Sequence, residues 1–596
     1  MLKPFILLFI LLISLFIINS CGGGSSTSGT VVIPTSVPTE GPTATPTNSP
    51  IGGNVPVPNG YTSVPANISN GTLELSVNNF SSSNEGYLLL TYHSDTPADT
   101  ANPIAINATF NNGTSGKENT ESSVPVSSVK KTSLAPAMSD KYRKYYKNHL
   151  DKLRHDFELV QELSRQGKYP RSLSNDELKS RGRLGKDGMV ASAQVGDTRN
   201  FWIYFPSPYG YMDRPCQCYA VGEHCYVFMD TDDPPLYFND ATTYAQQLAS
   251  YFDSQIYSTV HERVGYEWSP GIDGDTRIFI ILSANFNNAY YPFSDPYPQS
   301  SLPSGEYSNE VEAIYIDPLV FADTDSMGNP EAAENTLAQI QAVAGHEYTH
   351  MVRFNMKYIA SNKGTPIDYT TMGNYFSSEI CIHEGCAQYT ENVLLRRGIT
   401  DNYAKVNALR SSGLEPYLRA PELSSLTSGT FNSNSNDGLG TYEMGFFNVE
   451  YLYEKLGSDS IKRLNQADGK ICLDSLYAAA GNRNTFENLF DMHALALALS
   501  GKVSDNNYTF TGIDLTGNTS YGGTSLHNAW SAFGNTGIEG INVSQANNNS
   551  FSGYLYEWSP WFMRCYTGNG GTLSIKVTGL NVGQGGGNIK AYFVYR

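Results

Sequence analysis

Residues 345–355 read GHEYTHMVRFN, with two histidines four positions apart and a glutamate directly after the first. In a helix of 3.6 residues per turn, His346 and His350 lie one above the other, so both imidazoles can bind one metal ion. Glu347 lies about 100° around the axis, where it can act as a base on water without binding the metal. The pattern therefore predicts a zinc hydrolase site, with a polar patch on an ordinary helix as the alternative.

The flanking residues and a second helix supply the rest of the expected site. Apolar neighbours such as Val343 and Phe354 predict a buried helix, in which polar side chains need partners. Residues 377–398, SSEICIHEGCAQYTENVLLRRG, predict another helix, and Glu384 on it stands among apolar and small residues. Because a zinc enzyme needs a third protein ligand, Glu384 is the expected one. The adjacent His383 is the competitor, but it points about 100° away on the helix.

These two stretches resemble a known class of peptidases. HEYTH followed by HEGCAQY is similar to the His-Glu-x-x-His and Asn-Glu-Gly-x-Ala motifs of the gluzincin metallopeptidases, and its surroundings most resemble the hyicolysin-like family. The likeness covers residues 195–500 and is strongest from 340 to 457. It implies peptide-bond hydrolysis on a thermolysin-like fold. It also implies zinc held by His346, His350 and Glu384, with Glu347 as the catalytic base and acid.

A third stretch extends the resemblance. Residues 441–457, TYEMGFFNVEYLYEKLG, resemble the Tyr-x-x-Gly helix start of aminopeptidase-like gluzincins. By that analogy Tyr442 donates a hydrogen bond to the tetrahedral oxyanion, and a tyrosine that only packs is the alternative.

The helix of Glu384 departs from the family pattern at a supporting position. Many relatives carry an acidic residue four positions after the glutamate ligand, whereas this chain has the neutral Gln388. Glu391, two turns beyond Glu384, is a candidate substitute that could brace a zinc-binding histidine. Gly385 and Ala387 are small, so we expect this helix to pack closely on the helix of residues 345–355.

Along the chain, the patterns predict an α+β protein with a thermolysin-like zincin domain between two β-rich, sandwich-like modules. The lysines and arginines after Ser139 predict a solvated helix face. Whether residues 60–194 form an inhibitory pro-segment is left open. The expected segments are a signal peptide at 1–20, a Gly/Ser/Thr/Pro-rich tether at 21–59, a small β module at 60–112, a linker and helix at 113–194, the metallopeptidase domain at 195–500 and a C-terminal β-rich domain at 501–596.

The N-terminus predicts export. Residues 1–21 read MLKPFILLFILLISLFIINSC, and their apolar run is too short to span a bilayer comfortably but suits a signal peptide. Ile18 and Ser20 before Cys21 resemble the lipobox of bacterial lipoproteins, although Asn19 departs from the commonest pattern. We therefore expect a lipid on Cys21 and a place in the cell envelope or at the surface, with an ordinary cleaved signal peptide as the alternative.

The net charge limits the possible partners, and the cysteines raise the question of disulfide bonds. The net charge of −18 argues against nucleic acid as a partner. Export permits disulfides, and in CQCYAVGEHC, residues 216–225, we expect a local bridge such as Cys218–Cys225. The alternative is a metal site that uses Cys216, Cys218, His224 and Cys225.

Together these features predict a surface-anchored zinc endopeptidase that acts on proteins or peptides through a water activated by the zinc. No Gly-x-Met-Glu-Asn stretch precedes His346, and its absence favours an endopeptidase over an aminopeptidase. A non-enzymatic surface lipoprotein or adhesin with a structural zinc is the competing hypothesis. A fourth protein ligand would favour that structural role, because catalytic zinc keeps a position open.

Overall fold

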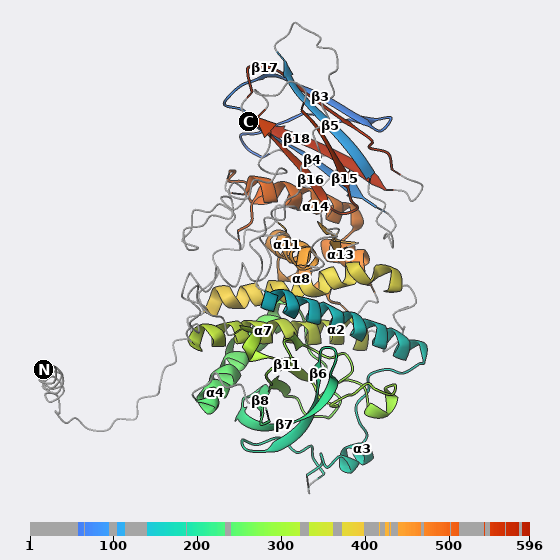
Figure 1. Cartoon of the computed structure of the whole chain (residues 1–596), viewed down its shortest axis with the longest axis vertical. Coiled ribbons are helices and arrows are strands. Elements are labelled where there is room, and N and C mark those ends of the chain that lie inside the picture. Colours follow the sequence, from blue (N-terminus) through green and yellow to red (C-terminus); the bar gives the residue numbers. More distant parts are fainter. Residues whose placement is uncertain are drawn as a thin grey trace, which may run out of the picture. The chain divides into compact units, whose positions relative to one another are not determined.

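The computed structural model of the chain describes two β-sheet regions and the helices between them (Figure 1). Cys21, the expected signal peptide and almost all of the expected tether lie outside the described residues. No helix in the described part of the chain is long and apolar enough to cross a membrane. The described residues are 58–64, 66–94, 104–113, 140–185, 188–232, 240–321, 333–360, 372–398, 417, 424–427, 429–430, 439–466, 470–500, 502–511, 541–542, 549–566, 568–582 and 587–596.

A mixed six-stranded sheet in the order β10-β11-β9-β8-β7-β6 supports the site. Strands β8, β9 and β11 are parallel, and every residue of β9 and β11 is buried, as expected for strands covered on both faces. The short strand β10 runs antiparallel to β11 and ends the sheet. The strands are β6 (Thr198–Phe205), β7 (Gly210–Val221), β8 (Cys225–Asp230), β9 (Ile278–Leu282), β10 (Ala289–Tyr290) and β11 (Ala313–Ile316).

Helices cover one face of this sheet and continue into a second, mainly helical layer. The first core lies between the sheet and helices that include α2, α4 and α7, and the second gathers around α8, α11 and α14. The helices are α2 (Asp140–Arg165), α3 (Asn175–Ser180), α4 (Ala241–Tyr251), α5 (Tyr257–Arg263), α6 (Pro318–Phe321), α7 (Ala333–Phe354), α8 (Met372–Gly398), α11 (Leu439–Leu456), α12 (Ser458–Leu464), α13 (Cys472–Ala480) and α14 (Arg483–Leu499). Shorter π or 3-10 turns lie at Phe252–Ile256, Gln299–Ser301, Asn355–Ile359 and Asn506–Tyr508.

The N- and C-terminal β-rich stretches do not form two separate modules. They share two sheets, in the orders β1-β18-β4-β16-β14 and β15-β5-β17-β3-β2, which enclose one apolar core. Strand pairing joins residues close to opposite ends of the chain, as in Thr62 opposite Tyr595. The strands are β1 (Thr62–Val64), β2 (Ile68–Ser69), β3 (Thr72–Phe80), β4 (Glu85–His93), β5 (Ile104–Gly113), β14 (Ile541–Asn542), β15 (Asn549–Leu555), β16 (Pro560–Tyr566), β17 (Gly571–Thr578) and β18 (Asn588–Tyr595), and the two-residue strands β12 (Ser424–Ser425) and β13 (Gly429–Thr430) pair apart from both sheets.

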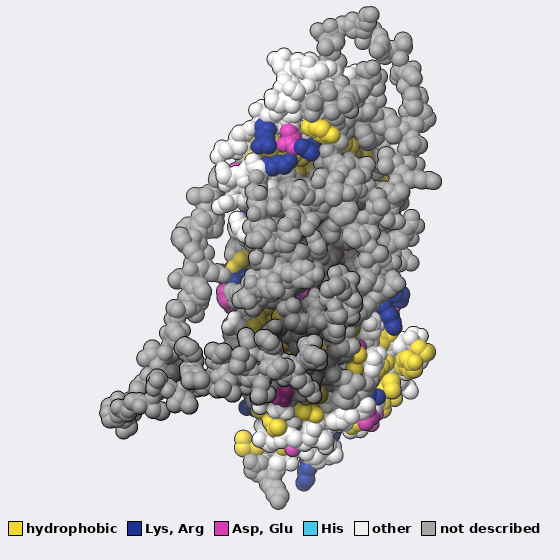
Figure 2. All heavy atoms as spheres, turned by 60° about the vertical axis from the view of Figure 1, so that its left-hand side comes forward, with side chains coloured by type: hydrophobic (Ala, Val, Ile, Leu, Met, Phe, Trp, Pro, Cys, Tyr) yellow, Lys and Arg dark blue, Asp and Glu magenta, His cyan; other side chains and the backbone are white. Residues whose placement is uncertain are grey.

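Charged side chains near the chain's end reinforce this pairing. Lys502, Arg564 and Arg596 all form ion pairs with Glu85 on β4. Burial alone would raise the pKa of Glu85, but hydrogen bonds from Lys502 and Tyr87 and the nearby positive charges lower it to about 2. On the face drawn in Figure 2, basic side chains gather around an acidic one in the upper part of the molecule.

The close packing expected of Gly385 occurs against a different helix. A Cβ atom at Gly385 would lie 2.4 Å from the backbone carbonyl carbon of Gly445 on α11, not against α7. The tight contact with α7 is made by Gly345, where a Cβ would lie 2.1 Å from the Leu394 side chain of α8. Helix α8 therefore lies between α7 and α11, and a small residue permits each approach.

The disulfide expected in residues 216–225 is wrong, since Cys216, Cys218 and Cys225 are free thiols. Cys216 and Cys218 belong to the core on one face of the sheet, whereas Cys225 belongs to the core on the other face. Side chains of a strand alternate between the two faces of its sheet. Spacing in the sequence is therefore a poor guide to the distance between these sulfur atoms.

Candidate metal centre

The two predicted histidines lie on the same face of helix α7, as their four-residue spacing predicts. His346 and His350 are 3% and 2% exposed, and their Nε2 atoms lie 3.0 Å apart. The two rings are therefore directed at one point in the interior. Helix α7 holds them rigidly, because apolar residues on its other faces pack into the core against the sheet.

Glu384 on α8 completes the predicted set of three ligands. Its Oε2 atom lies 3.4 Å from His346 Nε2 and 3.6 Å from His350 Nε2. The competing His383 does not join this group: its ring stacks on His350, with centroids 4.4 Å apart, and packs edge-on against Phe293. One helical step therefore separates a ligand from a packing residue, as the 100° rotation predicts.

The structure adds a residue that sequence analysis missed. His149 on α2 is 3% exposed, and its Nε2 atom lies 3.1 Å from Glu384 Oε1. One potential ligand atom from each of His149, His346, His350 and Glu384 falls within 4.8 Å of the other three. The prediction of a solvated face on this helix overlooked His149, because the surrounding sequence is rich in lysine and arginine and carries no metal-binding motif.

Hydrogen bonds on the far side of two rings indicate that this cluster suits a cation. His149 Nδ1 lies 2.7 Å from the Ala289 carbonyl oxygen and His346 Nδ1 lies 3.0 Å from a Glu391 carboxylate oxygen. Both oxygens only accept, so each Nδ1 carries a proton, and each ring, when neutral, presents a lone pair at Nε2. These lone pairs face the carboxylate of Glu384, which is also an acceptor. A Zn²⁺ ion between them would satisfy all of these atoms, and imidazole and carboxylate are ligands that zinc accepts.

Glu347 lies beside the cluster without taking part in it. It is fully buried, and neither carboxylate oxygen has a hydrogen-bond partner among the described residues. His149 Nδ1 is 3.9 Å from Glu347 Oε1. Burial raises the pKa of Glu347 to about 7, although the nearby histidines oppose this shift. A carboxyl group with such a pKa can both accept and release a proton near neutral pH.

The supporting residues resolve the departure noted at Gln388. Glu391 accepts the hydrogen bond from His346 Nδ1, and Gln388 donates from Nε2 to the same Glu391 oxygen at 3.1 Å. The acidic brace therefore stands at 391, and the neutral residue at 388 orients it. Such a partner fixes the ring and raises its basicity as a ligand.

Tyr442 falls within α11, but its side chain lies outside the described residues. Its role as an oxyanion donor therefore stays a prediction.

Comparison with known families agrees with this geometry. Residues 339–428 match the M61 glycyl aminopeptidase family. The matched segment contains His346, Glu347, His350 and Glu384 but leaves out α2, α11 and the sandwich. No curated protein matches the chain.

The family match and the buried cluster together support a zincin-type, zinc-dependent metallopeptidase of α+β fold. The predicted cofactor, zinc, is thereby confirmed. The closer likeness to the hyicolysin-like family, the thermolysin-like fold and the lipoprotein anchor stay predictions.

Proposed function

We propose that the protein is a zinc endopeptidase, exported and held at a membrane by a lipid on Cys21. The observation that carries the peptidase assignment is the convergence of His346, His350 and Glu384 beside a buried Glu347 that has no hydrogen-bond partner among the described residues. An unpaired buried carboxylate is costly for a site with a purely structural role. It is useful where a proton has to be moved.

The residues of the site divide the work of hydrolysis. His346, His350 and Glu384 would hold the ion, and zinc, when bound, would polarise the scissile carbonyl and activate the attacking water. Glu347 would take the proton from that water and then deliver it to the leaving amine. Glu391 would keep His346 in the orientation and tautomer that ligation needs.

An extended substrate has a place to bind beside this site. Strand β10 ends the sheet, and its Asn288 carbonyl oxygen bonds to the Asp317 N–H on the β11 side. The carbonyl group of Ala289 therefore points to the other side, because successive carbonyls of a strand alternate. A peptide added along this edge would run past the ligands on both sides of the scissile bond, which supports an endopeptidase.

An aminopeptidase is the second candidate, and the match to the glycyl aminopeptidase family favours it. An enzyme of that kind must recognise a free α-amino group, so a substrate with a blocked N-terminus separates the two.

Glu347→Gln tests the assignment directly. Cleavage of casein by the zinc-loaded protein should fall about 10²- to 10⁴-fold, the usual contribution of a general base, while zinc content stays unchanged. The measurement should be made in the parent and in a His149→Ala background, since His149 lies in the same cluster of potential ligands. An N-acetylated quenched peptide and glycyl-p-nitroanilide, assayed in parallel, decide between endopeptidase and aminopeptidase. Undiminished cleavage by Glu347→Gln would refute the role of this residue.

A further inference from the structure

We propose that His149 is a fourth zinc ligand and that helix α2 is an intramolecular plug, which holds the peptidase latent until α2 leaves. This inference rests on the proposed function and assigns the site its regulation. A catalytic zinc site has three protein ligands and one position for water, whereas four protein ligands close it. His149 Nε2 lies 3.1 Å from Glu384 Oε1, inside the ligand cluster, and would take that fourth position.

Helix α2 also covers the edge strand that a substrate would use. Asn148 donates from Nδ2 to the Asn287 carbonyl oxygen at 3.1 Å, and His149 donates from Nδ1 to the Ala289 carbonyl oxygen at 2.7 Å. The Ala289 carbonyl group is on the outer side of β10, and Asn287 lies two residues before this strand. One short stretch of α2 therefore blocks both requirements of catalysis, the open metal position and the free strand edge.

The remainder of α2 is seated deeply over the site. Phe157 packs edge-on against His383, with ring centroids 5.7 Å apart, and so contacts the residue next to the ligand Glu384. Lys152 and Asp156 form a buried ion pair at 2.5 Å, each only 1% exposed. Lys152 also lies 5.3 Å from the centre of the Tyr290 ring on β10.

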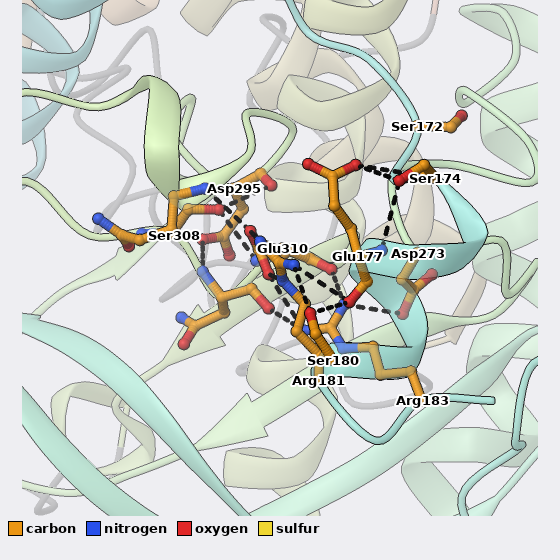
Figure 3. A network of polar contacts seen from close by, with 12 residues as sticks. Ser172, Ser174, Glu177, Ser180, Arg181, Arg183, Asp273, Asp295, Ser308 and Glu310 are labelled. Carbon is orange, nitrogen blue, oxygen red and sulfur yellow. Dashed lines mark hydrogen bonds and ion pairs between the residues drawn. The ribbon is translucent and has the colours of Figure 1, made fainter.

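The segment after α2 is fastened to the catalytic domain by arginines. Figure 3 shows Arg181 and Arg183 directed at Glu310 and Asp273. Arg181 Nη2 donates to Glu310 Oε1 at 2.7 Å, and Arg183 Nη2 donates to the Asn309 carbonyl oxygen at 2.8 Å. These contacts form an ionic clasp that keeps α2 over the site without adding to the apolar core.

Beyond this clasp the chain returns to the surface before β6 begins. Met189 and Val195 are 69% and 63% exposed there. Exposed connections are the usual places for proteolytic cutting, so this stretch offers a route to release α2. Strands β1–β5 would stay in place after such a cut, because they pair with strands β15–β18.

A structural zinc site is the competing explanation for four ligands. It does not account for Glu347, whose two buried oxygens find no hydrogen-bond partner among the described residues. It also gives no reason for a ligand on α2 to cap the carbonyl groups of an edge strand. A plug explains both, since it closes a site that is otherwise complete.

The coordination of the metal tests the plug without relying on activity. In the zinc-loaded full chain, X-ray absorption should count three imidazoles, and His149→Ala should show two imidazoles and a water. Acetohydroxamate binding to the Co²⁺ form can be followed by its visible spectrum. The concentration that gives half of the spectral change should be about 10- to 100-fold lower in His149→Ala than in the parent, because the parent site is open in only a small fraction of molecules. His155→Ala is the matched control, because His155 lies on the same helix with its side chain 41% exposed and pairs with Glu306.

The results separate the plug from the proposed function. Two imidazoles in the parent, or equal hydroxamate binding by parent and His149→Ala, would overturn the plug. The parent measurement decides this even where a variant folds poorly. Spectra that show an opened site in His149→Ala, together with no cleavage of casein or peptides, would sustain the plug and refute the peptidase. Cleavage of casein or peptides, together with the same metal coordination in the parent and His149→Ala, would sustain the peptidase and refute the plug.

Discussion

Among the described residues, we compare two buried clusters that combine histidine with carboxylates, one at the candidate metal centre and one where the sandwich meets α14. In the second cluster every polar group of Asp491 has a donor: Oδ1 accepts from Thr91 at 2.7 Å and contacts His93 at 2.9 Å, and Oδ2 accepts from Tyr592 at 2.6 Å. Asp491 is therefore saturated by hydrogen bonds from the protein itself.

The metal centre has the same residue types, but within the described part of the chain its carboxylate oxygens are largely without hydrogen-bond donors. Among the described residues, Oε2 of Glu384 and both oxygens of Glu347 lack a hydrogen-bond donor, and histidine nitrogens, which can bind a metal, are the groups nearest to Glu384. The comparison shows that residue type and burial do not separate a structural network from a metal site. The direction of the donors and acceptors does.

The largest expected effects come from removing one carboxylate from each cluster. Glu384→Ala should lose bound zinc in a His149→Ala background, where only His346 and His350 remain as ligands. Asp491→Ala should keep zinc at the parent level but lower the free energy of unfolding by about 3–5 kcal/mol, since it leaves His93 buried without its partner. Metal analysis and urea unfolding of both variants test this contrast. Zinc loss in Asp491→Ala, with the protein folded, would break the distinction between the clusters.

A smaller effect is expected from the close approach that positions Glu384. Gly385→Ala would place a Cβ 2.4 Å from the Gly445 backbone, so α8 has to move relative to α11. We expect a loss of about 3 kcal/mol in the free energy of unfolding, typical of overpacking, and weaker zinc binding because Glu384 is the adjacent residue. Gly553→Ala on β15 is the control, since its Cβ would have 3.4 Å to the nearest atom and should leave zinc affinity unchanged. Parent-like zinc affinity in Gly385→Ala would show that the approach does not position the ligand.

Much of the metal site was predictable because its spacing is local. The positions of His346, Glu347 and His350 follow from the turn of one helix, and the structure brings the two histidines to one point with Glu347 beside the cluster. Glu384 was predictable from its apolar surroundings. His149 was not, because 235 positions separate it from Glu384 and nothing in its neighbourhood distinguishes a ligand from a solvated histidine. A long-range ligand without a motif becomes visible only when the fold is known.

Long-range contacts were also the part of the fold that the sequence did not predict. Alternating residues predicted strands in both β-rich stretches, as in TLELSVNNF, residues 72–80, where buried and exposed positions largely alternate. The partners of those strands could not be predicted, because local periodicity carries no information about a strand 500 positions away. Two modules were therefore expected where the chain forms one sandwich from both ends.

A further prediction concerns the hydrogen bond between Glu391 and His346 at the edge of the metal site. Glu391→Gln should weaken zinc binding about 10- to 100-fold, because a neutral partner holds the His346 ring less firmly and makes it a weaker ligand. Gln388→Ala should weaken it less, since Gln388 acts only through Glu391. Competition with a chromophoric chelator measures both. Equal affinity of Glu391→Gln and parent would mean that the hydrogen bond to His346 does not tune the site.

The smallest expected effect is a pH dependence of stability that arises at the cluster of His93 and Asp491. Burial alone would lower the pKa of His93, but Asp491 and Glu487 raise it above the ordinary 6.5. A raised folded pKa means that the stabilisation is complete below about pH 6.5 and is lost as the pH rises through the folded value, by up to about 1.4 kcal/mol per pH unit. Thermal unfolding followed by tryptophan fluorescence over a range of pH values measures this loss.

Two variants isolate the titrating group in that experiment. His93→Gln should reduce the loss of stability above pH 6.5, because the amide keeps a hydrogen bond to Asp491 but does not titrate. His493→Gln should retain the loss, since burial lowers the pKa of His493 to about 3 and its ring is neutral throughout this range. The same slope in His93→Gln as in the parent would place the titration elsewhere. It would also show that Asp491, although its hydrogen bonds are all satisfied within the protein, does not keep His93 positively charged.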